Sequence, residues 1–245
     1  MFRFSFLRLG RGILLMGFVG FVFLKPFPSQ GEGVLEGREI TISGGVDFYD
    51  KYVWRGFTLD DDPVLQPGIT LSGYGLSLSF WSSWGMVGSA SDEADYILEY
   101  SRQIGEVTLF LGHTFYDFPG ADSSSKEYYL GISFPEVFLT PQFTFYRDYK
   151  AGKGEYYSLA LSHSFSLSEN VNLNIDFSTG YNRGLFIEGK GEDYQLLLSL
   201  DISLKEGVTL SPRVGYAVPS GDLKDPDDGD QVERFFTGVG ISFEM

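Results

Sequence analysis

His113 and His163 are the two histidines of this 245-residue sequence, and histidine is the side chain that most often serves as a general acid or base. Each lies in a segment where polar and apolar residues alternate, and each occupies a position in the apolar set of that alternation (the apolar phase). A histidine that activates a serine on a strand surface needs the spacing His-x-Ser, because alternate residues of a strand share a face. The residues two positions on are Phe115 and Phe165 instead, and Ser164 faces the other way. The sequence therefore predicts no catalytic residues, and a lipid hydrolase is the least favoured of three functional hypotheses.

Acidic residues gather in segments that read as loops: Asp60 to Asp62, Asp92 and Glu93, and Asp222 to Asp230. Clustered carboxylate oxygens are ligands that Ca²⁺ prefers, but the run Asp225-Pro-Asp-Asp-Gly-Asp230 lacks the spacing of a calcium loop. A solvated acidic loop is the favoured interpretation, and divalent-cation binding there stays open. The chain has no cysteine and no Gly-rich phosphate loop between a strand and a helix. We therefore expect no metal site and no cofactor.

Other charged residues lie on the polar phase of the alternating segments, which would face inward in a barrel. The candidate pore-lining residues on this phase are Asp47, Lys51, Arg55, Asp95, Glu99, Asp176, Asp201 and Arg213. Acids outnumber bases in this set, and carboxylates around a narrow passage favour cations. The pattern predicts a weak preference for cations among the small solutes that such a pore would pass.

The elements that would position these residues are β-strands. Residues 234–245 alternate without interruption, with Phe235, Val239, Ile241 and Phe243 on one face, and a period of two is typical of a strand. Eleven further segments alternate in the same way, including one that is expected to begin at Val137. Six long and five short connections join them alternately. We therefore predict an all-β fold, a transmembrane up-and-down antiparallel β-barrel of about 12 strands with both termini at the short-turn end.

Two features favour a membrane barrel over a soluble β-sandwich. The polar phase consists mainly of Ser, Thr, Gly and Asn, which suit a crowded lumen, and aromatic residues mark both ends of the apolar phase. Near the long loops these are Phe48, Trp84, Tyr96, Phe115, Tyr128, Phe145, Tyr157, Tyr181, Tyr194, Tyr216 and Phe235, and near the short turns Tyr100, Phe134, Phe165 and Phe243. The expected partners are outer-membrane lipid and lipopolysaccharide. The last strand resembles the closing strand of outer-membrane barrels that the insertion machinery reads, although it ends in Met245 where that pattern has Phe.

The N-terminus has the organisation of a secretory signal peptide. Arg3, Arg8 and Arg11 precede an apolar run from Ile13 to Leu24 that is too short to span a bilayer. We expect residues 1–31 to be the signal peptide and residues 32–245 to be the barrel. Export through a signal peptide would place the protein in the outer membrane of a Gram-negative cell. Removal of the peptide leaves 14 basic and 33 acidic residues, a net charge of −19, which excludes nucleic acid as a partner.

The segment Tyr52-Val-Trp-Arg-Gly-Phe57, followed by Asp61, Pro63 and Leu65-Gln-Pro67, resembles the TorF-type porin family of Gram-negative outer-membrane barrels. The match covers about 25 residues, and the rest of the chain matches only as a barrel pattern. The resemblance implies passive passage of solutes and identifies no substrate. From its own phase, Arg55 is expected either to line the pore mouth or to brace the acidic loop at residues 60–62.

Three functional hypotheses follow. The leading one is a porin-like channel for passive diffusion of small solutes across the outer membrane. The alternative is a non-conducting structural or surface-interaction barrel whose lumen is filled by bulky inward side chains. Those residues are Tyr49, Trp81, Phe110, Tyr116, Tyr129, Phe138, Tyr146 and Tyr156. The third is the lipid hydrolase.

Overall fold

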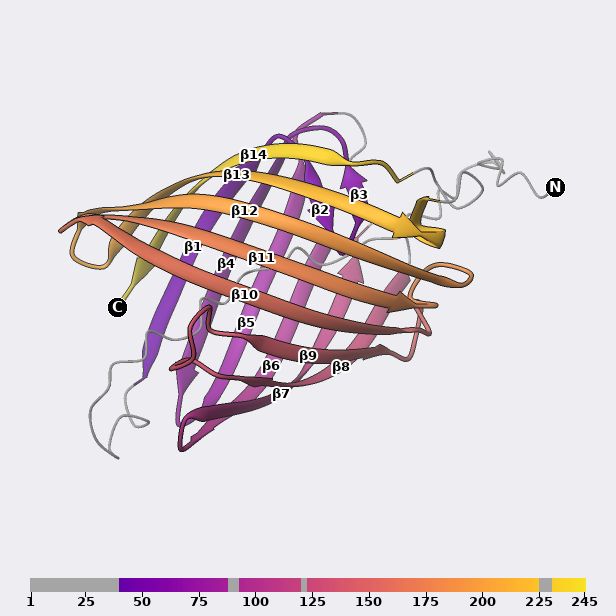
Figure 1. Ribbon diagram of the computed structural model, residues 1–245, viewed down its shortest axis with the longest axis horizontal. Coiled ribbons are helices and arrows are strands. Elements are labelled where there is room, and N and C mark those ends of the chain that lie inside the picture. The colour runs from indigo at the N-terminus through magenta and orange to yellow at the C-terminus, as the bar shows by residue number, and fades with distance from the viewer. Residues whose placement is uncertain (1–39, 88–92, 120–122, 225–230) are drawn as a thin grey trace.

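Twelve antiparallel strands form one closed barrel in the computed structural model, which describes residues 40–87, 93–119, 123–224 and 231–245 (Figure 1). The barrel strands are β1 (Thr41–Tyr49), β4 (Val64–Gly73), β5 (Leu76–Gly85), β6 (Glu93–Ile104), β7 (Val107–Phe118), β8 (Ser123–Ser133), β9 (Gln142–Asp148), β10 (Glu155–Ser168), β11 (Val171–Arg183), β12 (Lys190–Lys205), β13 (Val208–Gly221) and β14 (Arg234–Glu244). A separate hairpin consists of β2 (Tyr52–Trp54) and β3 (Phe57–Asp60), and one 3-10 turn, η2, spans Asp222–Lys224. Within the described ranges no helix is long and apolar enough to cross a membrane. The expected signal peptide, residues 1–31, lies outside the described residues.

The first and last strands close the ring. In register, Val46 of β1 faces Ile241 of β14 on one side and Pro67 of β4 on the other. At the end of the seam the backbone of Ile42 donates to the Met245 carbonyl at 3.0 Å, and the Met245 N–H donates back at 2.9 Å. The predicted closing role of residues 234–245 is confirmed. Closure satisfies the backbone of every strand within the sheet, which a lipid environment requires.

One strand boundary differs from the expectation. The strand expected from Val137 begins only at Gln142, because the preceding residues form a tight connection in which the Phe134 N–H donates to the Pro141 carbonyl at 3.0 Å. Pro135 has no N–H to donate to a neighbouring strand, and the backbone at Leu139 has a φ of 66°. The expectation that Phe138 points into the lumen is wrong as well. Its side chain is 73% exposed and its ring lies 5.0 Å from that of His163.

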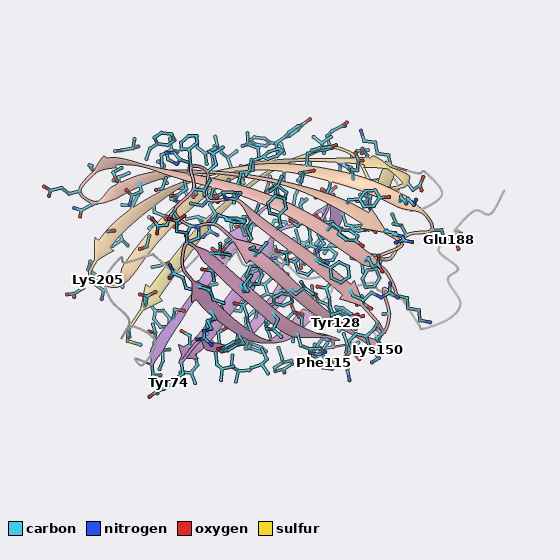
Figure 2. The ribbon with its side chains drawn as sticks, turned by 60° about the horizontal axis from the view of Figure 1, so that its bottom comes forward. Tyr74, Phe115, Tyr128, Lys150, Glu188 and Lys205 are labelled. Atoms are coloured by element: carbon cyan, nitrogen blue, oxygen red, sulfur yellow. The ribbon has the colours of Figure 1, made fainter. Side chains whose placement is uncertain are left out.

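The two faces of the barrel wall differ as the alternation predicts. Outward side chains in the middle of the strands are apolar and exposed, such as Leu98 and Leu111, whereas inward ones such as Trp81 and Tyr116 are buried. Exposed aromatic rings lie toward both ends of the outer surface (Figure 2). Tyr128 lies at the long-loop end, and Tyr74 marks the short-turn end. An apolar band between two aromatic girdles is the surface of a membrane-spanning barrel.

Glycines on the inner face make room for large rings. Gly112 on β7 is opposite Tyr129 on β8, and the Tyr129 ring occupies the space that a Cβ at Gly112 would need. Phe236 on β14 covers Gly215 on β13 in the same manner. The small inward residues therefore let aromatic side chains lie flat against the wall, and the lumen is crowded.

A closed barrel of this kind should resist sodium dodecyl sulfate. We expect the folded protein to migrate differently on gels before and after boiling, because a ring with no free strand edge unfolds slowly in detergent. The measurement is a pair of lanes, unboiled and boiled, from one sample whose β-structure has been checked by circular dichroism. Identical migration of such a folded sample would contradict the closed barrel.

Candidate functional site: a hairpin inside the barrel lumen

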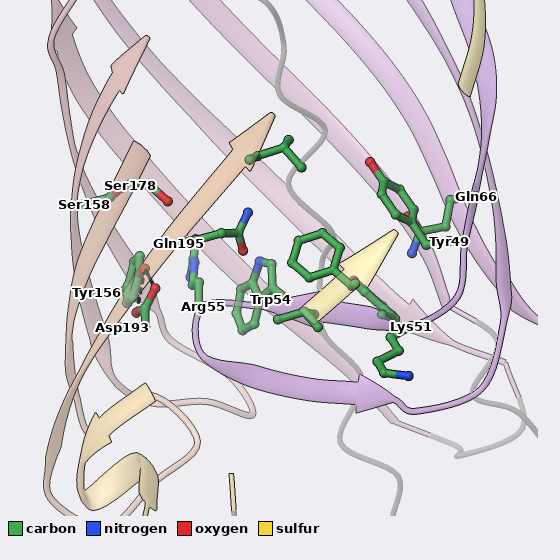
Figure 3. Close-up of a pocket in the computed structure, with 14 residues that line it drawn as sticks. Tyr49, Lys51, Trp54, Arg55, Gln66, Tyr156, Ser158, Ser178, Asp193 and Gln195 are labelled. Carbon is green, nitrogen blue, oxygen red and sulfur yellow. Dashed lines mark hydrogen bonds between the residues drawn. The ribbon is translucent and has the colours of Figure 1, made fainter. Parts of the chain in front are cut away.

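The connection between β1 and β4 folds into the barrel as the β2–β3 hairpin (Figure 3). Trp54 pairs with Phe57, and the two residues between them, Arg55 and Gly56, have φ values of 44° and 80°. Two left-handed residues in a two-residue loop are the geometry of a tight hairpin turn, and Gly accepts it without strain. A Cβ on Gly56 would lie 2.8 Å from the Cβ of Asp193 on β12. The hairpin therefore extends from the β1–β4 wall across the lumen to the opposite wall.

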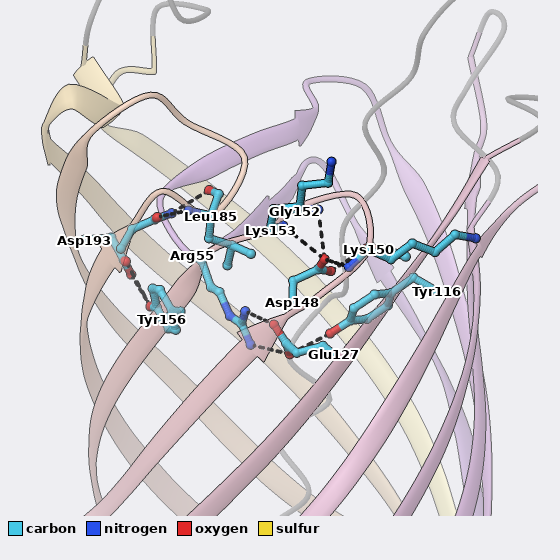
Figure 4. A network of polar contacts seen from close by, with 12 residues as sticks. Arg55, Tyr116, Glu127, Asp148, Lys150, Gly152, Lys153, Tyr156, Leu185 and Asp193 are labelled. Atoms are coloured by element: carbon cyan, nitrogen blue, oxygen red, sulfur yellow. Dashed lines mark hydrogen bonds and ion pairs between the residues drawn. The ribbon is translucent and has the colours of Figure 1, made fainter.

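Arg55 at the tip is fixed by a buried ion pair (Figure 4). Its Nη1 donates to Glu127 Oε2 at 2.8 Å and its Nη2 donates to Oε1 at 3.1 Å, and the Tyr116 hydroxyl donates to the same Oε1 at 2.8 Å. The side chains of Arg55 and Glu127 are only 3% and 2% exposed. Burial by itself lowers the pKa of Arg55, but the Glu127 carboxylate more than offsets this, so the net shift of the pKa is upward. The guanidinium is thus held as a cation inside the barrel, toward its long-loop end.

Aromatic rings surround the same guanidinium. Its central carbon lies 4.3 Å, 4.0 Å and 4.4 Å from the ring centroids of Trp54, Tyr146 and Tyr156 respectively. The Tyr156 hydroxyl in turn donates to Asp193 Oδ2 at 2.9 Å. A desolvated cation–π contact contributes about 2 kcal/mol, so these rings add to the ion pair in holding the hairpin tip.

The base of the hairpin is anchored as well. The Tyr52 hydroxyl donates to Glu93 Oε2 at 3.1 Å, and its ring lies 5.8 Å from that of Trp81. Burial, and then the Glu93 carboxylate, raise the pKa of the Tyr52 hydroxyl well above its ordinary value, so it stays a proton donor. The Thr58 N–H donates to the Gln231 side-chain oxygen at 2.7 Å. Contacts along its whole length therefore dock the hairpin.

A cavity of about 50 Å³ remains beside the hairpin (Figure 3). Its polar lining includes Lys51, Gln66, Ser158, Ser178 and Gln195. Since one water needs on the order of 10–15 Å³ of such volume, the cavity holds a few waters. At this level the lumen is narrow and polar.

The structure brings two of the predicted pore-lining residues together. Arg213 on β13 forms an ion pair with Asp47 on β1 at 2.5 Å and donates to the Tyr49 hydroxyl at 2.8 Å. Lys51, at the start of the hairpin, lies 3.6 Å from the carboxylate of Asp61. Positive charge in the lumen is therefore largely paired with acids.

The other predicted acids are distributed around the wall. Glu99 accepts a hydrogen bond from the Tyr129 hydroxyl at 2.8 Å. Asp176 accepts one from Ser162 at 2.5 Å, and Asp201 one from Ser211 at 2.6 Å. Asp95 is fully buried, and neither of its carboxylate oxygens has a hydrogen-bond partner within the described residues. Five acids therefore stand against three bases, Lys51, Arg55 and Arg213, among the predicted pore-lining residues.

One of the two expectations for Arg55 is wrong. Arg55 does not brace the acidic loop at residues 60–62, because the hairpin turns it away from that loop toward Glu127. Lys51 and Arg234 approach Asp61 instead, Arg234 at 3.8 Å. The Asp60 carboxylate accepts the Asp62 N–H at 2.9 Å, and burial is the main cause that raises the pKa of Asp60.

Sequence reasoning did not identify the acids that receive the hairpin, and it placed Glu93 in a loop, whereas Glu93 is the first residue of β6 and is buried. Glu93 and Glu127 share the inward phase of Asp95 and Tyr129, so their direction was readable from the alternation. Their hydrogen-bond partners could not be predicted from the alternation, because Tyr52 lies 41 residues from Glu93 and Arg55 lies 72 residues from Glu127 along the chain. Asp193, which receives Tyr156, belongs to the same group.

The two histidines lie on the outer surface among aromatic rings. The His113 Nε2 and the Tyr149 hydroxyl are 2.8 Å apart, and the His163 ring lies 4.5 Å from that of Phe165. In the part of the chain that the structure describes, no three His, Asp or Glu side chains gather so that they could hold a metal ion.

Comparisons with known proteins identify the fold. No family model and no curated protein matches the sequence. Among solved structures, the NanC porin matches with a TM-score of 0.53 at 10% identity, over 84% of this chain and all of that one. The KdgM porin matches with a TM-score of 0.54 at 12% identity, over 83% of this chain and 98% of that one. LpxR from Salmonella typhimurium, a lipid-hydrolase barrel, matches with a TM-score of 0.52 at 8% identity, over 83% of this chain and 99% of that one. The chain therefore has the fold of outer-membrane β-barrels. Sequence identities of 8–12% show a shared fold and no shared function.

Proposed function

We propose that the protein is a porin-like channel of the outer membrane, through which small solutes diffuse passively. The observation that carries this proposal is the hairpin inside a closed, polar-lined barrel, which narrows the lumen at Arg55 and leaves a polar cavity beside it. The NanC and KdgM porins share the barrel fold, and the resemblance of residues 52–67 to TorF-type porins supports the same function. Export through the signal peptide at residues 1–31 belongs to this proposal.

A weak preference for cations is part of the proposal. Five of the predicted pore-lining residues are acids and three are bases, and an excess of carboxylates around a narrow passage attracts cations. The KdgM porin has been solved with disordered oligogalacturonate, an acidic saccharide. The acidic wall here supports small neutral or cationic solutes instead.

A second candidate function is a non-conducting barrel. The hairpin crosses the lumen, inward aromatic rings crowd it, and the cavity beside the hairpin measures only about 50 Å³, which favours a lumen that is closed at rest. A hydrolase has no comparable support, because Tyr149, Phe138 and Phe165 surround the two histidines.

Single-channel recording in planar bilayers tests the channel, and Arg213→Ser tests its selectivity. The substitution removes a lumen cation and frees the Asp47 carboxylate, so we expect the reversal potential under a salt gradient to move further toward cations. Wild-type protein measured at the same gradient is the reference, and Arg102→Ser, outside the lumen on β6, is the control. An anion-selective wild-type channel would contradict the acidic lumen. No conductance from a barrel that resists detergent would favour the non-conducting alternative.

A further inference from the structure

A row of cations crosses the outer surface of the barrel at its long-loop end. The strand register aligns Arg147 on β9 with Glu155 on β10, Glu155 with Arg183 on β11, and Arg183 with Lys190 on β12. The neighbouring inward positions are buried at Asp148, Tyr156 and Asn182, so the members of the row face outward. Adjacent strands are about 4.8 Å apart, which places Arg147 and Arg183 about 10 Å apart on either side of one glutamate.

An aromatic row lies directly on the membrane side of these cations. Phe145, Tyr157 and Tyr181 are aligned in the same register, two residues further from the long loops. Their rings touch in sequence, with centroids 5.2 Å and 6.3 Å apart. Aromatic rings of this kind sit at the level of the lipid headgroups, and two residues of strand add about 7 Å. The cationic row therefore lies at the outer edge of the headgroup layer.

This concentration of positive charge is unusual for so acidic a chain. Six of the 14 basic residues that follow residue 31 lie at this end of β8 to β12: Lys126, Arg147, Lys150, Lys153, Arg183 and Lys190. Figure 2 shows Lys150 at the same end of the barrel as Tyr128 and Phe115. The acids at this end include Glu155 in the row, Glu188 in the β11–β12 connection and Glu192 next to Tyr194, and Asp222 accepts the backbone N–H of Lys190 at 2.7 Å.

Within the row the arginines share a single acid. Arg147 and Arg183 approach the two oxygens of Glu155 at 3.1 Å and 3.3 Å, and the Tyr157 hydroxyl donates to it at 3.0 Å. The Arg183 side chain remains 62% exposed. Two guanidinium groups on one carboxylate leave one positive charge unbalanced, and each has further N–H donors free for a second anion.

We propose that this row, Arg147–Glu155–Arg183–Lys190, binds the phosphate groups of an outer-leaflet lipid. Arginine forks match phosphate oxygens in pairs, and the aromatic row below provides an apolar surface for the acyl chains. The occupant is a phosphorylated saccharolipid, because the row lies at the long-loop end, and the long loops of outer-membrane barrels are on the outer side of the membrane. The inference rests on the proposed outer-membrane location but not on conduction through the lumen.

The test is lipid binding by the refolded, full-length barrel in detergent micelles. The probe is diphosphorylated lipid A, compared with the same lipid after enzymatic removal of both phosphates, with thermal unfolding as the readout. We expect lipid A to raise the unfolding temperature and the dephosphorylated lipid to do so much less. Arg147→Ser combined with Arg183→Ser should weaken lipid A binding at least about tenfold, since two charge-assisted contacts with the phosphates are lost.

Glu155→Gln separates lipid binding from a structural role of the arginines. Removing the shared acid frees both guanidinium groups, so we expect lipid A to bind more tightly, by about two- to fivefold. If the row were only an internal ion-pair cluster, this substitution would leave lipid binding unchanged or weaken it, which would overturn the proposal. Arg102→Ser, an outward cation near the short turns, is the matched control and should not change binding.

Two other outcomes would also overturn the lipid site. One is equal stabilisation by the lipid with and without phosphates, and the other is unchanged lipid A binding in the double arginine variant. Should the double variant fail to fold, Glu155→Gln and the phosphate dependence of the wild type decide alone. Ion conductance of the same wild-type preparation, measured in parallel, shows separately whether the channel function holds.

Discussion

Glu127→Gln is expected to undock the hairpin and to destabilise the barrel by about 3–5 kcal/mol. The substitution removes the carboxylate but leaves the Arg55 guanidinium buried between Tyr146 and Tyr156 without its counter-charge. Losing one partner of a buried ion pair is costly for this reason. The unfolding free energy in urea, measured in lipid vesicles, gives the cost. A hairpin released from the lumen should also raise the single-channel conductance and expose residues 50–62 to protease.

The control variants distinguish a lost charge pair from a general effect in the lumen. Glu99→Gln removes another lumen acid, but its partner is the neutral Tyr129 hydroxyl, so we expect a loss of about 1 kcal/mol or less. Combining Arg55→Gln with Glu127→Gln removes both charges and keeps an acceptor for the Tyr116 hydroxyl, so much of the stability should return. If Glu127→Gln costs no more than Glu99→Gln, the ion pair does not hold the hairpin.

Leu198→Arg is expected to cost about 2–4 kcal/mol. Leu198 lies near the middle of β12 on the outward face, in register with Ile175 and Val214 on the neighbouring strands. A guanidinium there would have to enter the hydrocarbon layer, where no water or counter-charge compensates it. The measurement is the urea unfolding free energy of the barrel in lipid vesicles, compared with the wild type.

Gln195→Arg is the matched control on the same strand. Gln195 faces the lumen and lines the polar cavity beside the hairpin, so a cation there remains in contact with water rather than with hydrocarbon. We expect this substitution to change the unfolding free energy by less than half of the Leu198→Arg effect. Equal losses at the two positions would contradict the assignment of inner and outer faces.

The porin-like channel and the non-conducting barrel assign different roles to the β2–β3 hairpin. If the wild-type protein conducts, the polar cavity beside Arg55 is the passage, and release of the hairpin widens it. If the wild-type protein is silent and Glu127→Gln conducts, the hairpin closes the barrel at rest. Recordings from both variants in one bilayer system therefore decide between the channel and the closed barrel.

The sequence by itself determined the barrel and its two faces. Side-chain alternation is a local property, since a strand turns successive residues to opposite sides, and so 12 strands and the inward phase of Asp47, Asp95 and Arg213 were readable residue by residue. The alternation failed where a local hydrogen-bonded turn replaced a strand, between Pro135 and Gln142. A proline has no backbone N–H to donate to a neighbouring strand, and the alternation of apolar residues gives no sign of this loss.

Only the tertiary structure decided what fills the lumen. The alternation places Arg55 on the inward phase, but nothing in the spacing of residues 52–57 shows that the segment folds into the lumen as a hairpin. Its position depends on Arg55 meeting Glu127 across 72 residues of chain, and on the rings of Tyr146 and Tyr156 from two other strands packing on the same guanidinium. The cationic row from Arg147 to Lys190 likewise exists only because the strand register aligns residues of four strands. Closing the barrel brings distant residues together, and this long-range geometry is absent from any local pattern.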